Sequence, residues 1–316
     1  MKHFLKLTFL CFFTGTSAFF AEAQVTVYGL TGPSGLGMIR LFEQPPKYSG
    51  TALKVEALPQ PDLMAARLIS GEAKIGVLPP NIAAKIASAG KGIQVAAVLG
   101  TGMLSLLTRD PSIQRIEDLK GQSVEVAGPG ATPDYVFRRI LLAKKMNPDK
   151  DLKLNYSLGT SEIAQSLIAG RVSTGLLPEP FATMARAGKP DLRLVSDIQQ
   201  EWAQAGGNGN YPVTVLVVAG DFAASQPALL KTILNAVKSS IEWVVSHPAE
   251  AGALAEKHHM GIGASVAAAA IPRSNYVFIP ASEARPGLEA LYRAFLEFAP
   301  ASIGGKLPGE NFYLKW

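Results

Sequence analysis

AARLISGEAKIGVLPPNIA at Ala65–Ala83 matches AQSLIAGRVSTGLLPEPFA at Ala164–Ala182 at eight of 19 positions, without a gap. In each copy an apolar segment with helical spacing ends at a glycine, Gly71 or Gly170. Glycine can adopt the positive φ that commonly ends a helix. The repeated pattern predicts that the chain contains one structural unit twice.

The unit continues with a short strand, at Lys74–Leu78 in the first copy and at Ser173–Leu177 in the second, which stops at a proline. Proline suits the first turn of a following helix, because the N–H that it lacks would be unpaired there. The unit is therefore a helix–strand–helix piece of an α/β sheet. Open α/β sheets bind ligands at the carboxyl ends of their strands. Two copies predict two similar lobes around a shared cleft; the alternative is chance similarity between two α/β segments.

The composition is that of a well-packed globular protein. The chain has 316 residues, of which 48% are hydrophobic and 17% charged. This length exceeds one typical domain and suits two lobes, and the low charge argues against disorder. The formal net charge is +5. Because no basic run is interleaved with aromatic residues, we expect no nucleic-acid partner.

Residues 1–23 have the three parts of a secretory signal peptide. Lys2 and Lys6 make a positive start. The run Leu7–Phe20 is uncharged and mostly apolar but short for a membrane span, and an A-x-A cleavage site follows at Ala21–Ala23. We expect cleavage after Ala23 and a periplasmic location; the alternative is an uncleaved membrane anchor.

Residues for metal or covalent chemistry are scarce. Cys11 is the only cysteine, so the cleaved chain could hold no Cys-ligated zinc, iron–sulfur cluster or disulfide. The adjacent His258 and His259 would point in different directions on a helix, and no H-E-x-x-H motif occurs. Glu179 is the one carboxylate in an expected cleft loop, without a partner for general acid–base catalysis. We therefore expect no metal, no cofactor and no catalytic group.

A glycine-rich turn, Leu30–Gly37, follows the first expected strand, Val25–Gly29, and precedes a helix expected at Met38–Glu43. Such a turn brings backbone N–H groups and a helix N-terminus close to a ligand. The glycine spacing fits neither a dinucleotide fingerprint nor a P-loop. The turn predicts a ligand-binding loop; the alternative is a tight turn without a ligand.

A second turn, Gly128–Asp134, lies between a strand expected at Ser123–Ala127 and an amphipathic helix at Tyr135–Lys145. Thr132 is suited to the N-cap of this helix, with Pro133 at N1. The turn predicts a site for an anion or a hydrogen-bond acceptor. Asp134 would repel an anion if its side chain pointed inward, and an ordinary β–α turn is again the alternative.

Apolar periodicity predicts the other elements. The other expected strands are Ala52–Ala57, Ile93–Leu99, Met103–Thr108, Leu152–Tyr156, Asp191–Val195 and Val213–Val218. The other expected helices are Asp62–Ile69, Ser112–Leu119, Ser161–Ala169, Pro227–Ser246, Ala249–Lys257, Ala264–Ile271 and Gly287–Phe298. We expect two crossings between the lobes, one at Met103–Thr108 and one after the flexible stretch Ala205–Tyr211. The aromatic tail through Trp316 is expected to pack on the first lobe.

These features together resemble one protein family. The signal peptide, the doubled L-I-x-G…G-x-L-P unit, the Gly128–Asp134 turn and the Glu179-Pro180 dipeptide are similar to those of the periplasmic substrate-binding proteins of ABC importers. The relevant importers carry nitrate, sulfonates, taurine and thiamine-precursor pyrimidines (the NitT/TauT-like family). The resemblance covers nearly all of residues 25–316.

The resemblance implies a type II periplasmic-binding-protein fold. Two α/β lobes would be joined by two crossover segments, with the helical C-terminal part packed on the first lobe. The implied division is a signal peptide at residues 1–23, a first lobe at 24–108 and 210–316, and a second lobe at 109–209.

The resemblance also implies where a ligand would be held. The positions that match the ligand loops of the family are Thr31, Gly32, Ser34, Asn81, Thr101, Gly130, Ala131, Thr132, Glu179, Asn210 and Tyr211. Tyr28, Phe181 and Tyr211 would be the candidates for stacking on an aromatic solute.

The implied function is capture of a small anionic or heteroaromatic solute and its delivery to an ABC permease in the inner membrane, by a monomer. The alternative is an enzyme on the same two-lobed fold, of the pyrimidine-precursor synthase or small-molecule lyase type. A sensory or scaffold role would leave the same sequence features.

Overall fold

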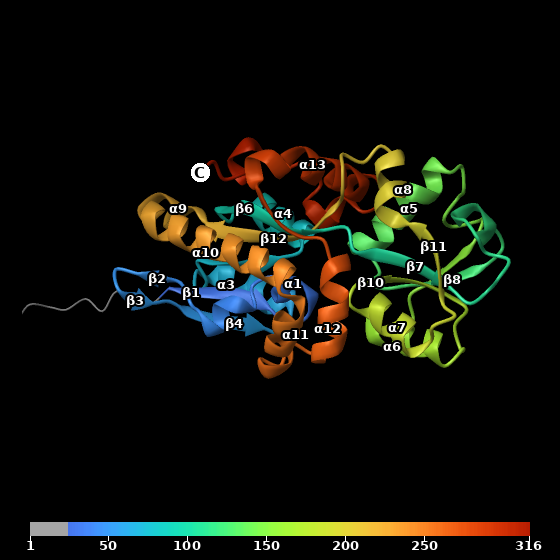
Figure 1. The fold of residues 1–316 in the computed structure, drawn as a ribbon. Helices are drawn as coiled ribbons and strands as arrows, with labels where there is room; N and C mark the ends of the chain where they lie inside the picture. The colour runs from blue at the N-terminus through green and yellow to red at the C-terminus, as the bar shows by residue number, and fades with distance from the viewer. Residues whose placement is uncertain (1–24) are drawn as a thin grey trace, which may run out of the picture.

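The computed structural model describes residues 25–316, and these form two lobes around two separate β-sheets (Figure 1). The first sheet has the order β13-β6-β12-β5-β1-β4 and the second the order β11-β7-β10-β8-β9. Residues 1–24, which contain the expected signal peptide and its cleavage site after Ala23, lie outside the described part of the chain. The expected two-lobed α/β fold is confirmed.

The strands of the first sheet are β1 (Thr26–Leu30), β4 (Lys54–Leu58), β5 (Ile75–Leu78), β6 (Ile93–Thr101), β12 (Pro212–Ala219) and β13 (Tyr276–Pro280). Strands β4, β1 and β5 are parallel, whereas β12 runs antiparallel to both β5 and β6. Every residue of β5 is buried, which explains why this strand reads as an unbroken apolar run. A short ribbon of β2 (Lys47–Tyr48) and β3 (Thr51–Ala52) lies apart from this sheet.

The strands of the second sheet are β7 (Leu104–Thr108), β8 (Ser123–Val126), β9 (Lys153–Asn155), β10 (Thr174–Pro178) and β11 (Arg193–Asp197). Strands β10, β8 and β9 are parallel, and β7 runs antiparallel to its neighbours β10 and β11. The ends of β8, β10 and β11 and the start of β7 therefore meet at one edge, and this edge faces the first lobe.

Helices surround both sheets (Figure 1). Those of the first lobe are α1 (Pro33–Leu36), α2 (Arg40–Glu43), α3 (Pro61–Ser70), α4 (Pro80–Ser88), α9 (Gly220–Ser225), α10 (Pro227–Ser246), α11 (Pro248–Lys257), α12 (Ala264–Ala270) and α13 (Ala281–Phe298), with the 3₁₀ turns η2 (Ile271–Arg273), η3 (Pro300–Ile303) and η4 (Glu310–Phe312). Those of the second lobe are η1 (Ile116–Leu119), α5 (Thr132–Ala143), α6 (Thr160–Ile168), α7 (Phe181–Gly188) and α8 (Ile198–Gln204).

The repeated sequence unit forms α3–β5–α4 in the first lobe and α6–β10–α7 in the second, as predicted. Gly71 and Gly170 have φ values of 81° and 74°, so both adopt the left-handed conformation that their place after a helix led us to expect. Both copies present the loop after their strand toward the other lobe.

The chain passes between the lobes at two places. It leaves β6 at Thr101 and enters β7 at Leu104, and it returns from α8 to β12 through residues 205–211. The expected strand at Met103–Thr108 forms, but it lies within the second sheet, and Gly102 and Met103 make the passage. The boundary expected after Thr108 therefore falls at the far end of β7, away from the passage.

Two expected helices differ from the observed ones. A helix over Ser112–Leu119 was expected, but only its end is helical, as η1. Side chains compete for the backbone here: Asp110 accepts the amide of Ser112, and Asp118 accepts the amide of Gln114. The helix expected at Met38–Glu43 forms over Arg40–Glu43 as α2, and a short helix that was not expected, α1, begins before it at Pro33.

The helical C-terminal third packs on the first lobe, as the fold prediction required. Helix α13 contacts β6, β12 and β13. The tail follows this surface: Tyr313 bridges to Val95, and the Trp316 indole Nε1 donates to the Ala96 carbonyl oxygen at 3.1 Å. Within residues 25–316, no helix has both the length and the apolar character that a membrane span requires.

Candidate functional site

A cavity of about 210 Å³ lies between the two lobes. It is bordered by loops at the carboxyl ends of β1 and β5 in the first sheet and of β8 and β10 in the second, and by the first passage. Its lining residues are Pro33, Ser34, Pro79, Asn81, Met103, Leu104, Ala131, Thr132, Pro133, Pro178, Val213 and Thr214. Both copies of the repeated unit thus contribute the proline at the end of their strand, Pro79 in the first copy and Pro178 in the second.

Ser34 and Asn81 give the first lobe's side of this cavity its polar groups. The Ser34 hydroxyl lies 3.2 Å from the Thr214 hydroxyl on β12, which fixes it over the central strands. Asn81 lies in the first turn of α4, whose N-cap is Pro79. Amides in a first helical turn have no partner within the helix and lie at its positive end, so this side of the cavity favours an acceptor atom on a ligand.

Thr132 gives the second lobe's side its hydroxyl. The expectation that Thr132 caps α5 was wrong: the N-cap is Ala131 in an extended conformation, with Thr132 and Pro133 as the first two helical residues. The reason is the turn that precedes the helix, because the Ala131 amide is already bonded to the Gly128 carbonyl at 3.1 Å. Thr132 is thereby released from capping and borders the cavity instead.

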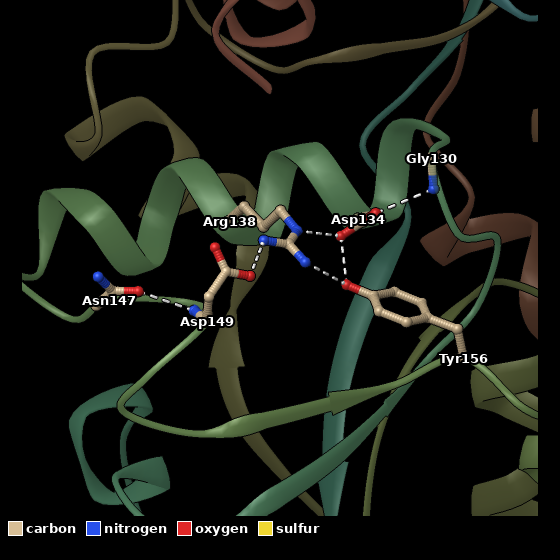
Figure 2. A network of polar contacts seen from close by, with 6 residues as sticks. All are labelled: Gly130, Asp134, Arg138, Asn147, Asp149 and Tyr156. Carbon is tan, nitrogen blue, oxygen red and sulfur yellow. Dashed lines mark hydrogen bonds and ion pairs between the residues drawn. The ribbon is translucent and has the colours of Figure 1, made fainter. Parts of the chain in front are cut away.

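Asp134 does not border the cavity and is held in a buried polar network (Figure 2). One carboxylate oxygen accepts the Gly130 amide at 3.0 Å, and the other accepts Arg138 Nε at 2.8 Å and the Tyr156 hydroxyl at 2.7 Å. Burial and the neighbouring carboxylate raise the pKa of Tyr156. Asp134 therefore anchors the turn before α5 and would not repel an anion in the cavity.

The network extends outward from Arg138 (Figure 2). Its guanidinium also donates to Asp149 at 2.7 Å and to the Tyr156 hydroxyl at 3.1 Å. The side chain of Asp134 is 7% exposed and that of Asp149 is 71% exposed. The buried ion pair between Arg138 and Asp134 is therefore the stronger of the two, because solvent screens the exposed pair between Arg138 and Asp149.

Glu179 and Asn210 line a different interlobe crevice, of about 420 Å³, on the other side of Met103 and Leu104. Glu179 is 3% exposed, and one of its oxygens accepts the Thr183 amide at 3.0 Å. Burial raises the pKa of Glu179, while hydrogen bonds from Thr183 and nearby guanidinium groups oppose the rise. The sequence could place Glu179 after its strand but could not tell into which crevice its side chain turns.

The structure thus brings together Ser34, Asn81, Ala131 and Thr132 of the expected ligand residues, and not the others. Thr31, Gly32, Thr101, Gly130 and Tyr211 do not border the cavity. Tyr211 is fully buried and bonded to the first passage. Tyr28 and Phe181, the other expected stacking partners, do not border it either.

Sequence reasoning missed the apolar part of the site. Met103 of the first passage, Leu104 at the start of β7 and Val213 of β12 are its apolar side chains, and Thr214 of β12 adds a hydroxyl that was missed as well. A sequence signal did exist for the rest, since Pro33, Pro79, Pro133 and Pro178 all lie directly at strand-to-helix turns. Within residues 25–316, no three His, Cys, Asp or Glu side chains come together as a metal site would need.

Two α/β lobes, two passages and a cavity between the lobes define the periplasmic-binding-protein class of fold. The model of NMT1/THI5-like proteins matches residues 48–251, so the chain belongs to the NMT1/THI5-like family. The family resemblance drawn from the sequence is thereby confirmed. No curated protein matches the sequence.

Solved structures show the same fold. An ABC transporter protein from Parabacteroides distasonis is 27% identical, with a TM-score of 0.78 over 92% of this chain and 98% of that one. The periplasmic aliphatic sulphonate binding protein SsuA from Escherichia coli is 17% identical, with a TM-score of 0.72 over 92% of each chain. A mutant of DSZB in complex with biphenyl-2-sulfinic acid is 14% identical, with a TM-score of 0.62 over 90% of this chain and 95% of that one.

Proposed function

We propose that this chain is an extracytoplasmic solute-binding protein that captures a small solute between its lobes and delivers it to an ABC permease in the inner membrane. The observation that carries the proposal is the cavity itself. It is built from the strand-end loops of both sheets, and Asn81 and Thr132 face it from opposite lobes.

The lining favours capture over chemistry. Its side chains are prolines, aliphatic groups, methionine, two threonines, one serine and one asparagine. Asn81, Thr132 and Ser34 can donate and accept hydrogen bonds, but a reaction would need a nucleophile with a base beside it. The cavity therefore has the groups that orient a solute and not those that would consume it.

The size and polarity of the cavity limit which solutes it can accept. A volume of about 210 Å³ is below the roughly 300–1,000 Å³ of sites for drug-sized ligands. The walls are largely apolar, and the starts of α4 and α5 supply the partial positive charge of helix N-termini. We infer a compact solute with an apolar or flat body and one acceptor group, either an anionic group or a heteroaromatic nitrogen or oxygen.

The lobes would close on this solute about the two passages. We assign residues 25–101 and 212–316 to the first lobe, residues 104–204 to the second, and the hinge to Gly102–Met103 and residues 205–211. Strand pairing supports this division, because β6 and β7 belong to different sheets although two residues separate them.

The location and partners follow from the same proposal. The secretory signal at residues 1–23 would be cleaved after Ala23 and leave a monomeric periplasmic protein. The periplasmic placement is supported by the similarity to SsuA from Escherichia coli, which is a periplasmic sulphonate binding protein. The membrane partner would be the permease that receives the solute.

A thermal-shift screen of the protein from Gln24 onward tests the function. The panel contains nitrate, taurine, alkylsulfonates, thiamine and its pyrimidine, riboflavin, bicarbonate and aromatic carboxylates. A solute at 100 times its dissociation constant should stabilise the fold by about 2.7 kcal/mol. The expected result is one stabilising solute that is recovered unchanged. A solute that is consumed would instead establish an enzyme.

Two variants tie the response to the cavity. Ala131→Trp should fill the cavity and abolish the stabilisation, because Ala131 borders it from the N-cap of α5. Thr232→Val, on α10 of the first lobe, removes a hydroxyl that does not border the cavity and should leave the response unchanged. Full stabilisation of the Ala131→Trp variant would mean that the solute binds elsewhere.

A further inference from the structure

Two arginines from opposite lobes border one hollow outside the solute cavity. Arg186 lies on α7 of the second lobe, and Arg273 ends η2 of the first. They line a hollow of about 320 Å³ together with Thr183, Ala187 and Pro190. Helix α12, which leads into η2, contacts α7. The distance between the two guanidinium groups therefore depends on how the lobes are placed.

Within residues 25–316 neither guanidinium forms a direct ion pair with a carboxylate, although both oppose the rise in the pKa of the buried Glu179 through their charge. Arg273 Nη1 donates to the Ala269 carbonyl oxygen at 2.8 Å, which orients the side chain and leaves its other nitrogens free. Arg186 makes no hydrogen bond or ion pair with any described residue. Two exposed, positively charged side chains thus border one hollow without a direct ion-pair partner.

Glu179 is the carboxylate on which both arginines act. Glu179 lies in the adjoining crevice, which both arginines also border. Its side chain is buried and one of its oxygens accepts the Thr183 amide at 3.0 Å, which holds that oxygen at the start of α7. The hollow itself has no carboxylate in its lining.

We propose that a small tetrahedral oxyanion, such as sulfate or phosphate, binds between Arg186 and Arg273 and links the two lobes. The planar guanidinium fork donates paired hydrogen bonds to oxyanions. An anion that contacts both lobes has a higher affinity for the arrangement that brings the arginines together, and it stabilises that arrangement accordingly. The hollow shares no lining residue with the solute cavity, so the proposal does not depend on which solute the protein carries.

Calorimetric titration with sodium sulfate tests the site. The titration is made at low ionic strength, with sodium chloride at matched ionic strength as reference, because salt screens exposed charges. One saturable site is expected, and R186A and R273A should each weaken sulfate binding at least fivefold. The matched control is R171A, which removes an exposed arginine of the same lobe and should leave binding unchanged. Absence of saturable binding, or binding of sulfate by R186A and R273A as tight as by the wild type, would overturn the proposal.

Ala131→Trp separates this site from the solute cavity. Sulfate binding should be as tight in A131W as in the wild type and at least fivefold weaker in R186A. The reverse result would place the anion in the solute cavity, which would overturn this inference and support the proposed function. Small-angle scattering without solute tests the link between the lobes. Sulfate should reduce the radius of gyration of the wild type and not that of R186A, and binding without any reduction would contradict the link.

Discussion

The Tyr211 hydroxyl lies 3.2 Å from the Leu104 amide nitrogen and accepts its hydrogen bond, so one side chain joins the two passages between the lobes. The same hydroxyl donates to the Gln199 side chain at 3.0 Å, and the Tyr211 carbonyl accepts the Gly102 amide at 2.8 Å. Asn275 adds a hydrogen bond from the first lobe to the Gly102 carbonyl. These hydrogen bonds join the two passages, which should therefore move together as one hinge.

Tyr211→Phe should destabilise the protein. The change removes the hydrogen-bond partner of the Leu104 amide and of the Gln199 side-chain oxygen Oε1. Leaving such groups unpaired away from solvent costs about 1–3 kcal/mol. Urea unfolding followed by circular dichroism measures the loss. Tyr48→Phe is the control, because it removes the hydroxyl of a partly exposed residue on the β2–β3 ribbon, outside both passages, and it should change stability by less than about 0.5 kcal/mol. Equal effects of the two variants would argue against the role of the Tyr211 hydroxyl.

Gly102→Ala should disturb the hinge. A Cβ at this position would lie 2.6 Å from Gln199 Cγ and 2.9 Å from Tyr211 Cε1, so the passages would have to separate. Overpacking of this kind costs about 1–3 kcal/mol. The measurements are the unfolding free energy and the radius of gyration from small-angle scattering. Gly92→Ala is the control, because a Cβ there meets no atom within 4 Å; a hinge that tolerates Gly102→Ala equally well would contradict the close fit.

Asp134→Ala should cost about 3 kcal/mol of stability, at the low end of the range for breaking a buried ion pair, because Arg138 is partly exposed. It should also weaken solute binding, since the Gly130 amide loses the carboxylate that holds the turn before Thr132. Asp149→Asn removes the exposed partner of Arg138 and should cost less than about 1 kcal/mol. Urea unfolding and the solute dissociation constant separate the two effects. Unchanged solute binding by a folded Asp134→Ala variant would show that the network does not position the site.

Glu179→Gln should gain stability relative to the wild type as the pH rises. Burial raises the pKa of Glu179 above its usual value, so the folded state holds the proton more tightly than the unfolded chain does. The carboxyl therefore contributes stability at a pH below its unfolded pKa of about 4.3, and this contribution is lost as the pH rises through the folded pKa. Glutamine does not titrate. The stability of Glu179→Gln relative to wild type should increase from pH 4 toward neutrality.

Unfolding measured at several pH values tests this expectation. Glu250→Gln, at an exposed position of α11, is the control and should show no such trend. A pH-independent difference between Glu179→Gln and wild type would mean that the carboxyl is not held in a less favourable environment than in the unfolded chain.

The sequence carried most of the fold because its strands are short apolar runs bounded by glycine and proline. The repeat at Ala65–Ala83 and Ala164–Ala182 predicted two lobes, and α10 was predicted with its observed bounds, Pro227–Ser246. Elements with weaker patterns were missed, among them β13 and α8. Strand β13 owes its place to pairing with β6, which no local pattern reveals.

The site was predicted less completely for a physical reason. Position along the chain identifies which loops end at the carboxyl edge of a sheet, and four of the expected ligand residues do border the cavity. The direction of each side chain depends on neighbours far away in sequence. Glu179 turns into the other crevice and Tyr211 into the hinge. Thr132 borders the cavity only because Ala131 takes the N-cap.

The four prolines of the cavity wall have a spectroscopic consequence. Proline has no backbone N–H, so Pro33, Pro79, Pro133 and Pro178 give no peaks in an amide-detected NMR spectrum. Their fixed φ angles also leave little backbone freedom to lose when a solute arrives. A solute titration followed by amide shifts would therefore register weakly at the cavity itself. Labelled methyl groups on Met103, Leu104, Val213 and Ala131, which border the same space, would report the solute directly.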